Sequence, residues 1–341
     1  MTKSNFIYLF VIIIVLSFSC TEQVAKTKDE TPADTHTPII KSKTFLLDSL
    51  IEANHNNSEL FYNRSLYYYE TDFQPKALVD ILTAIKLEKT NPKYYLHGGE
   101  VYIAMSQGQE AIDLINDGLQ NCKNNEELFL RATEYNFYMK DYKKATILVN
   151  DLLKINKNNA DAYFFKGLIL KNSDYKTKAI SNFQTCIEQD PTHYNAYMQL
   201  GLLFSEKNDD LAISYFNNAL KLENQSREAL YAKAYHYQQQ QAFNKAKQTY
   251  IQMIRNDNKD YQAFYNIAYC LMEQDSLQKS YKHFKVAANI KIDHVDAIFM
   301  MGQIAERIGD IPNAKIHYHT ALKLLPDNET IKQALAEVNA K

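Results

Sequence analysis

The sequence contains no tryptophan and few of the residues that interrupt regular secondary structure. Its 341 residues include only 8 glycines and 7 prolines. Because Gly and Pro mark turns and end helices, their scarcity favours helices over strands. Charge of either sign is not in excess either, since the formal net charge is −2. This balance gives no reason to expect nucleic acid or an anionic membrane surface as a partner.

Cysteine is scarce, and the motifs of common enzymes are absent. Cys20, Cys122, Cys186 and Cys270 are widely and irregularly spaced, so they indicate neither a zinc site nor a disulfide framework. In an exported chain the last three could pair, but a packing role fits them better. GxGxxG, GxxxxGK[ST], HExxH and GxSxG do not occur. We therefore expect no enzymatic activity, no metal and no cofactor.

The first twenty residues have the layout of an export signal. Residues 6–18 are almost wholly apolar; a run of about 13 residues has the length of a signal-peptide core and is too short to span a bilayer. The small Ser19 then precedes Cys20. The arrangement resembles the lipobox of bacterial lipoproteins, whose cysteine carries lipid, although Ser17 stands where Leu is usual and Leu16 lies one residue earlier. An uncleaved signal anchor, or a signal peptide with a chance cysteine, is the alternative.

A polar tether follows. Residues 21–42 are dominated by threonine, charge and proline, so they bury too little to fold and are predicted to be disordered. A flexible chain of this length would reach roughly 25–30 Å on average. We assign 1–19 to a lipoprotein signal peptide and 20–43 to the lipidated cysteine and a linker.

From residue 58 onward the sequence repeats. A small residue opens eight similar segments, and consecutive members of this set are 34, 34, 34, 33, 34, 34 and 34 residues apart. The set is Ala77, Ala111, Ala145, Ala179, Ala212, Ala246, Ser280 and Ala314. Counted within each unit, place four is aromatic or large and apolar, place eight is small, and place twenty-four is large and apolar. Small residues let two antiparallel helices approach closely, and the large ones fill the remaining space.

This pattern resembles the tetratricopeptide repeat (TPR) over residues 58–328. The resemblance implies an all-α fold, a right-handed α-solenoid of about eight helix-turn-helix units, each with a helix A and a helix B. Residues 44–57 and 329–341 are expected to form capping helices with polar outer faces. The units are 58–91, 92–125, 126–159, 160–193, 194–226, 227–260, 261–294 and 295–328.

The resemblance also implies a concave groove, lined by places two, five, nine, twelve and thirteen of each unit. These forty places hold three cations, Lys93, Lys171 and Arg307, against eleven carboxylates. The carboxylates are Glu59, Glu70, Glu100, Glu127, Glu134, Asp161, Glu206, Glu228, Glu273, Asp296 and Glu306. No cluster of cations suits the C-terminal carboxylate that chaperone-binding TPR domains grip.

Aromatic residues line the same places. Tyr231 and Tyr235, and likewise Tyr265 and Tyr269, lie one helical turn apart, and Phe164 and Phe299 occupy place five of other units. With Glu228 and Glu273, these residues suit an extended segment with apolar and basic side chains. The alternative is that the aromatics only pack helices and the acids only solubilise the chain.

We therefore expect a non-enzymatic scaffold that binds a protein or peptide, attached to membrane through lipid on Cys20. Its expected location is the bacterial cell envelope, in the outer membrane, since Thr21 replaces the Asp associated with retention at the inner membrane. Two alternatives stay open: an assembly factor for a pilus, a secretion system or cell-wall enzymes, or an accessory subunit of a glycan-handling complex whose tyrosines stack on sugars.

The lipid prediction can be tested at one residue. Cys20→Ala should leave the protein folded but unprocessed, released or misplaced, because each buried CH₂ of an acyl chain contributes about 0.8 kcal/mol to membrane binding. Palmitate labelling and membrane fractionation would measure this. Unchanged processing with undiminished labelling would refute the assignment.

Overall fold

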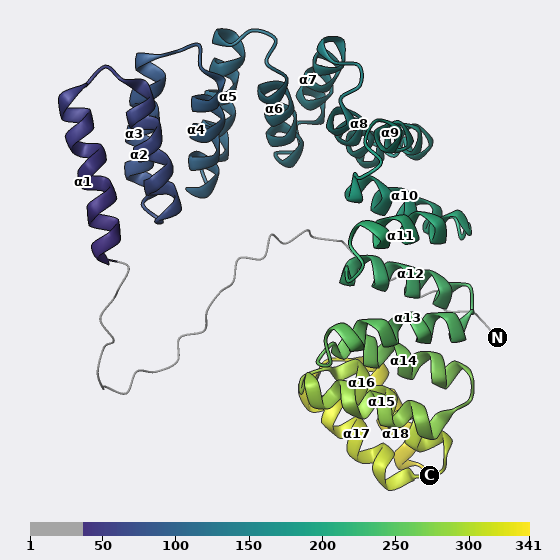
Figure 1. Ribbon diagram of the computed structural model, residues 1–341. Coiled ribbons are helices and arrows are strands. Elements are labelled where there is room, and N and C mark those ends of the chain that lie inside the picture. The colour runs from purple at the N-terminus through teal and green to yellow at the C-terminus, as the bar shows by residue number, and fades with distance from the viewer. Residues whose placement is uncertain (1–36) are drawn as a thin grey trace.

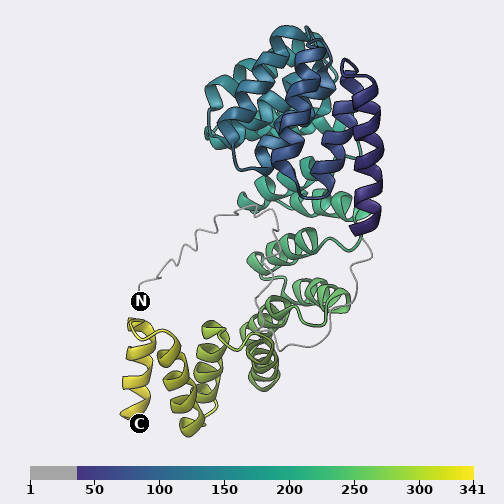
Figure 2. The same ribbon diagram turned by 90° about the vertical axis from the view of Figure 1, so that its left-hand side faces the viewer.

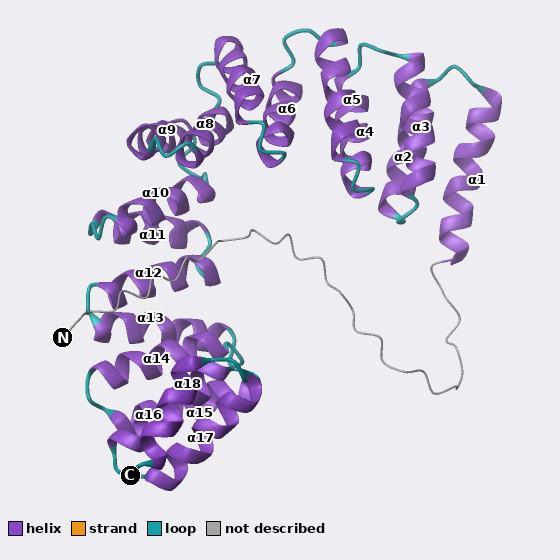
Figure 3. Cartoon of the chain, turned by 180° about the vertical axis from the view of Figure 1, so that it is seen from behind, coloured by secondary structure: helices purple, strands orange, loops and turns teal. Residues whose placement is uncertain are grey.

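A computed structural model describes the backbone of residues 37–341 and the side chains of residues 44–341. Over that range the chain forms 18 helices and no strand (Figure 3). The predicted signal peptide and Cys20 lie outside the described residues. The all-α solenoid predicted from the repeat is confirmed.

The helices follow one another as antiparallel pairs between two single helices, α1 (Thr37–Ala53) and α18 (Glu329–Asn339). The eight pairs are α2 (Ser58–Glu70) with α3 (Gln74–Leu87), α4 (Pro92–Ala104) with α5 (Gly108–Asn121), α6 (Glu126–Tyr138) with α7 (Tyr142–Ile155), α8 (Ala160–Asn172) with α9 (Lys176–Gln189), α10 (Tyr194–Glu206) with α11 (Leu211–Leu222), α12 (Arg227–Gln239) with α13 (Phe243–Asn256), α14 (Tyr261–Glu273) with α15 (Leu277–Ile290), and α16 (Val295–Arg307) with α17 (Ile311–Leu324).

Every A helix starts at a side chain that caps it. The residue before each A helix, and the one before α18, accepts a hydrogen bond from a backbone N–H of the first turn, which satisfies one of the donors that a helix start leaves unpaired. These caps are Asn57, Asn91, Asn125, Asn159, His193, Ser226, Asp260, His294 and Asn328. They recur with the period of the repeat, so the same local signal restarts the helix in each unit.

Every A helix also ends in the same way. One residue in each A–B turn has a positive φ, and the next N–H bonds back to a carbonyl five residues earlier, as in the Schellman motif. For example, Lys140 has a φ of 62°, and the N–H of Asp141 donates to the carbonyl of Asn136 at 2.9 Å. The residues with positive φ in these turns are Asp72, Ser106, Lys140, Asp174, Asn208, Gln241, Asp275 and Gly309.

Within a unit, the two helices approach closely through the small residue at place eight. A Cβ atom on Gly201 would lie 2.4 Å from the ring of Phe216, and one on Gly302 would lie 2.5 Å from the ring of Tyr318. Both rings are almost fully buried. The small and large residues predicted at these places therefore do pack against each other.

The units stack into a curved row (Figure 1). Several neighbouring A helices contact one another, α2 with α4, α4 with α6, α6 with α8 and α10 with α12, whereas among the described residues no two neighbouring B helices do so to the same extent. The A helices therefore lie on the inner side of the curve. Figure 2 shows that the row also winds out of the plane of Figure 1.

The fifth unit, which is one residue shorter than the others, loses length in its B helix rather than in the turn. Its B helix, α11, has 12 residues, whereas the other B helices have 14. Four residues, 207–210, separate α10 from α11, compared with three in the turn between α8 and α9. The deletion therefore shortens one helix without changing the stacking.

The first helix differs from its prediction in two ways. It begins at Thr37, so the last seven residues of the linker predicted over 20–43 are helical, and it ends at Ala53 rather than 57. Pro38 falls in the first turn, where proline is tolerated, so it does not oppose this earlier start.

The outer face of α1 is also not polar. Ile51 is buried, and Arg64 ties the helix down by contacting Asp48 of α1 at 2.6 Å and Asp80 of α3 at 2.7 Å. The opposite side nevertheless exposes Phe45, Leu46 and Leu50, with exposed fractions of 72%, 60% and 42%. At the other end, α18 buries Ile331, Leu335 and Val338 and turns polar residues outward, as expected of a cap.

The turn geometry predicts that replacing lysine by glycine stabilises the protein at one position and destabilises it at another. Lys140→Gly should raise the free energy of unfolding by about 0.5–1 kcal/mol, because a non-glycine residue pays about 1–2 kcal/mol for a left-handed conformation. Lys282→Gly, in the interior of α15 and also exposed, should lower it by about 1 kcal/mol. Urea unfolding followed by circular dichroism would measure both, and a loss of stability in both variants would contradict the motif.

Candidate binding groove

The inner surface of the A helices is the candidate functional site, and its aromatic residues divide into two groups. Tyr231 and Tyr235 of α12 lie one turn apart with their rings nearly parallel, at 5° and 6.2 Å between centroids. Tyr231 also packs edge-on against the buried Tyr250 of its own B helix, at 6.1 Å. Tyr235 projects beyond it and is 42% exposed. The ring of Tyr231 thus supports the ring of Tyr235.

Tyr265 belongs to the packing group. Its ring lies 5.2 Å from that of Phe284 in α15 and stacks on His294 at 5.0 Å. His294 caps α16 by accepting the N–H of Ala297 on Nδ1, which requires a neutral imidazole. Burial lowers the pKa of His294 and so favours that neutral form. Tyr265 therefore helps join the seventh unit to the eighth.

The two predicted phenylalanines also pack within their own units. Phe164 lies 4.7 Å from the ring of His193 and 5.8 Å from that of Phe183. Phe299 lies 5.5 Å from the ring of Tyr318. They belong to α8 and α16, which Figure 1 shows far apart along the row. The structure therefore does not bring them together with the tyrosines of α12 and α14.

Tyr235 and Tyr269 meet at a shallow hollow of ≈ 280 Å³. The hollow is formed by the end of α12, the turn after it, the start of α13 and the end of α14. Burial, and then the carboxylate of Glu273, raise the pKa of the Tyr269 hydroxyl. The lining residues are Tyr235, Gln238, Gln239, Gln241, Phe243, Tyr269 and Glu273.

Glu228 and Glu273 lie at opposite ends of the groove. Glu228 is in the first turn of α12, where burial and then Glu223 raise its pKa. Glu273 is the last residue of α14. Since the A helices of a solenoid run in the same direction, a helix length of roughly 18 Å separates the two carboxylates across the groove. A single side chain of a ligand cannot contact both.

The acidic character of the groove is partly neutralised by distant parts of the chain. Glu206 pairs with Lys176 at 2.8 Å and Glu306 with Lys341 at 2.6 Å. Arg131 lies between Glu100 and Glu134. By contrast, no ion pair within the described residues involves Glu228 or Glu273. These acids keep their charge available to a ligand.

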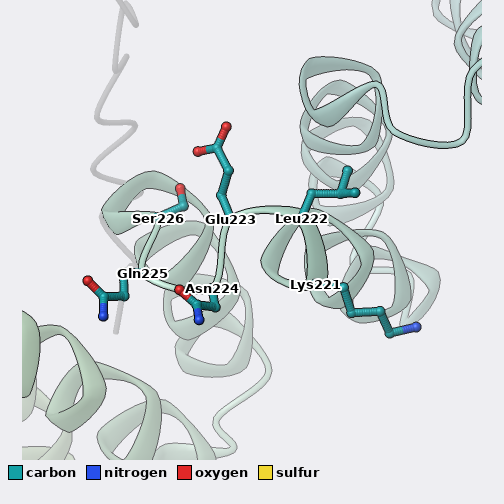
Figure 4. Close-up of a pocket in the computed structure, with 6 residues that line it drawn as sticks. All are labelled: Lys221, Leu222, Glu223, Asn224, Gln225 and Ser226. Atoms are coloured by element: carbon teal, nitrogen blue, oxygen red, sulfur yellow. The ribbon is translucent and has the colours of Figure 1, made fainter.

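A second hollow, of ≈ 450 Å³, lies at the loop between α11 and α12 and is formed by residues 221–226. Figure 4 shows its six side chains pointing away from one another rather than toward a common centre. All six are consecutive in the sequence, so no second element completes the site. Although it is larger than the hollow at Tyr235, it is a weaker candidate for binding because it lacks convergent groups.

The described cysteines contribute no chemistry. Cys122, Cys186 and Cys270 are free and buried, and burial raises the pKa of the Cys186 and Cys270 thiols to about 12. Thiols held neutral in this way are poor nucleophiles. Within the described range no group of three or more His, Cys, Asp or Glu residues could hold a metal ion. The helices in that range are also too short or too polar to cross a bilayer.

Comparisons with known proteins agree with the geometry. The tetratricopeptide repeat model matches residues 160–193. The C-terminal part of a TPR repeat-containing protein from Cytophaga hutchinsonii superposes with a TM-score of 0.62 at 16% identity, covering 72% of this chain and 99% of that one. PilW, described as a widely conserved type IV pilus biogenesis factor, gives a TM-score of 0.50 at 18% identity, over 62% of this chain and 98% of its own.

A curated relative matches a short stretch only. Protein O-mannosyl-transferase TMTC1 of Homo sapiens is 33% identical over 69 residues, which is 20% of this chain. The match spans 8% of the length of that protein.

The fold and groove define a solenoid of paired antiparallel helices with a concave inner face. Residues 160–193 match the tetratricopeptide repeat, and the structures with a similar fold are those of tetratricopeptide-repeat proteins, a class whose concave faces bind protein or peptide partners.

The sequence did not single out the glutamines of the hollow. Gln238 and Gln239 occupy groove places twelve and thirteen, and the run of four glutamines at 238–241 was the available signal. Phe243 was not considered because it belongs to a B helix. Its side chain reaches the hollow because the A–B turn is only three residues long.

The division of the tyrosines predicts different costs of truncation. Tyr265→Ala should lower the free energy of unfolding by about 2 kcal/mol, because the half-buried ring packs on Phe284 and His294. Tyr235→Ala should lower it by less than about 1 kcal/mol, since only the stack with Tyr231 is lost. Urea unfolding would measure both values. Equal losses would show that Tyr235 is also a packing residue.

Proposed function

We propose that this protein is a non-enzymatic scaffold that binds an extended protein segment along the inner face of its A helices. The observation that carries the proposal is the pairing of an exposed aromatic, Tyr235, with Tyr269 and an unpaired carboxylate, Glu273, around one hollow. Aromatic rings bury large areas at low entropic cost, which is why they dominate protein interfaces. Uncompensated acids add attraction for basic segments.

The proposal includes attachment to a membrane of the bacterial cell envelope, the outer membrane, through lipid on Cys20. It is supported by the short apolar run before that residue and by its position outside the repeats. The other three cysteines are buried in the repeat array. A lipidated protein of this kind would hold its groove close to machinery of the envelope.

Assembly of such machinery is the more specific form of the proposal. PilW, which shares the fold, is described as a type IV pilus biogenesis factor. We infer by analogy that the groove here holds a component of a pilus, a secretion system or the cell-wall apparatus during assembly. Because fold similarity alone motivates this step, mass spectrometry of partners that co-purify from detergent-solubilised membranes is the direct test.

Binding to a glycan is the second candidate, since tyrosines and glutamine amides are also groups that contact sugars. The two candidates differ in their response to salt. Capture of basic peptides should weaken at least tenfold between about 50 and about 500 mM NaCl. The Debye length shortens as the salt concentration rises, so the attraction between exposed charges is screened more strongly. Glycan binding should change little.

The decisive comparison uses a peptide library and a glycan array with the full-length protein and a Tyr235→Ala/Tyr269→Ala variant. We expect the variant to lose salt-sensitive peptide capture. Tyr175→Ala is the matched control, because Tyr175 is 57% exposed but lies in the turn before α9. Undiminished capture by the double variant, with normal circular dichroism, would reject the groove as the binding site; salt-insensitive glycan capture would favour the sugar candidate.

A further inference from the structure

The hollow at Tyr235 and Tyr269 carries a charge that the protein leaves uncompensated. Glu273 is the one charged residue in its lining and is exposed to solvent. The nearby cations bind elsewhere: Lys247 donates to the side-chain oxygen of Gln274 at 2.5 Å, and Arg307 pairs with Asp275 at 3.0 Å. The described residues therefore supply no positive group to this carboxylate.

Elsewhere the protein places its own lysines over aromatic rings. Lys291 lies 5.0 Å from the ring centroid of Tyr261, and Lys245 lies 5.5 Å from that of Tyr237. Comparable contacts join Lys76 to Tyr68 and Lys178 to Tyr175, both at 5.3 Å. No such contact covers Tyr235 or Tyr269 within the described range. A ring that faces solvent beside a carboxylate is thus open to a cation from outside.

The walls of the hollow are held in place. Tyr235 is kept parallel to Tyr231, and the side-chain oxygen of Gln238 accepts a hydrogen bond from the buried Tyr250 hydroxyl at 3.1 Å. Because these groups are already fixed, a ligand would pay little entropy to order them. The space, ≈ 280 Å³, suits one side chain rather than a folded domain.

We propose that this hollow is a specificity site that accepts one arginine or lysine side chain of the bound segment. Arginine fits better, because a planar guanidinium can stack on a tyrosine ring while it donates two hydrogen bonds to Glu273. The inference rests on the proposed function, since it names the kind of ligand side chain that binds at one place in the groove. It separates this hollow from the remaining acids, which would act only through long-range attraction.

The test uses full-length protein in detergent and fluorescein-labelled decapeptides from a positional-scanning library, read by fluorescence polarisation. The peptide that binds most tightly is then synthesised again with citrulline in place of one arginine at a time. Citrulline keeps the shape of arginine but removes its charge. We expect one citrulline substitution to weaken binding at least tenfold. Glu273→Gln should cause a similar loss, and the two changes together should cost no more than either alone, as for groups that contact each other.

Glu188→Gln is the matched control, because Glu188 is also exposed and in no ion pair among the described residues, but it lies on the B helix α9 and outside the groove places. It should change affinity less than twofold, and circular dichroism would verify that every variant is folded. If decapeptides bind but neither Glu273→Gln nor citrulline changes the affinity beyond twofold, the cation site is overturned while groove binding stands. If no decapeptide binds the wild-type protein, the proposed function fails, and this inference fails with it.

Discussion

The contact between a small residue and a large apolar side chain inside each unit determines the rest of this structure. At Gly167 and Gly201 there is no room for even a methyl group beside the rings of Phe183 and Phe216. This close approach fixes the distance between helices A and B. Because a contact of this kind recurs every 33 or 34 residues, each unit adds a similar rotation to the row. The A helices thereby come to line the inner side, and the concave face follows from packing alone.

The same constraint limits how many aromatic residues are available for binding. A ring at place five points into the junction between its own B helix and the next unit, so Phe164, Tyr265 and Phe299 are used for packing. Place nine lies one turn later and points past that junction, which leaves Tyr235 exposed above the supporting Tyr231. The aromatic surface open to a ligand in the proposed groove is therefore concentrated where adjacent units both carry tyrosine at place nine.

Much of this fold could be predicted because three local signals share one period. The same structure restarts in every unit because each unit repeats a small residue at place eight, a helix cap such as Asn91 and a turn such as that at Asp174. The start of α1 lies before the first repeat, where no period helps, and its prediction failed for that reason. The roles of Tyr231 and Tyr265 could not be separated either, since place in a repeat gives the direction of a side chain but not its neighbours across the unit boundary.

The partners of the groove acids could not be predicted from place in the repeat either. Their pairing also bears on why one hollow matters more than the total charge. Counting suggested an acidic face, but residues far along the chain lie against several of its members: Lys341 pairs with Glu306 at 2.6 Å, and Nε2 of His193 lies 3.3 Å from a carboxylate oxygen of Asp161. Such partners can be found only in three dimensions. The remaining charges, spread along the groove and screened by salt over about 8–10 Å, act nearly independently of one another. The proposed recognition of a basic segment would therefore depend on places where an unpaired acid and an exposed ring coincide, rather than on the field of the groove as a whole.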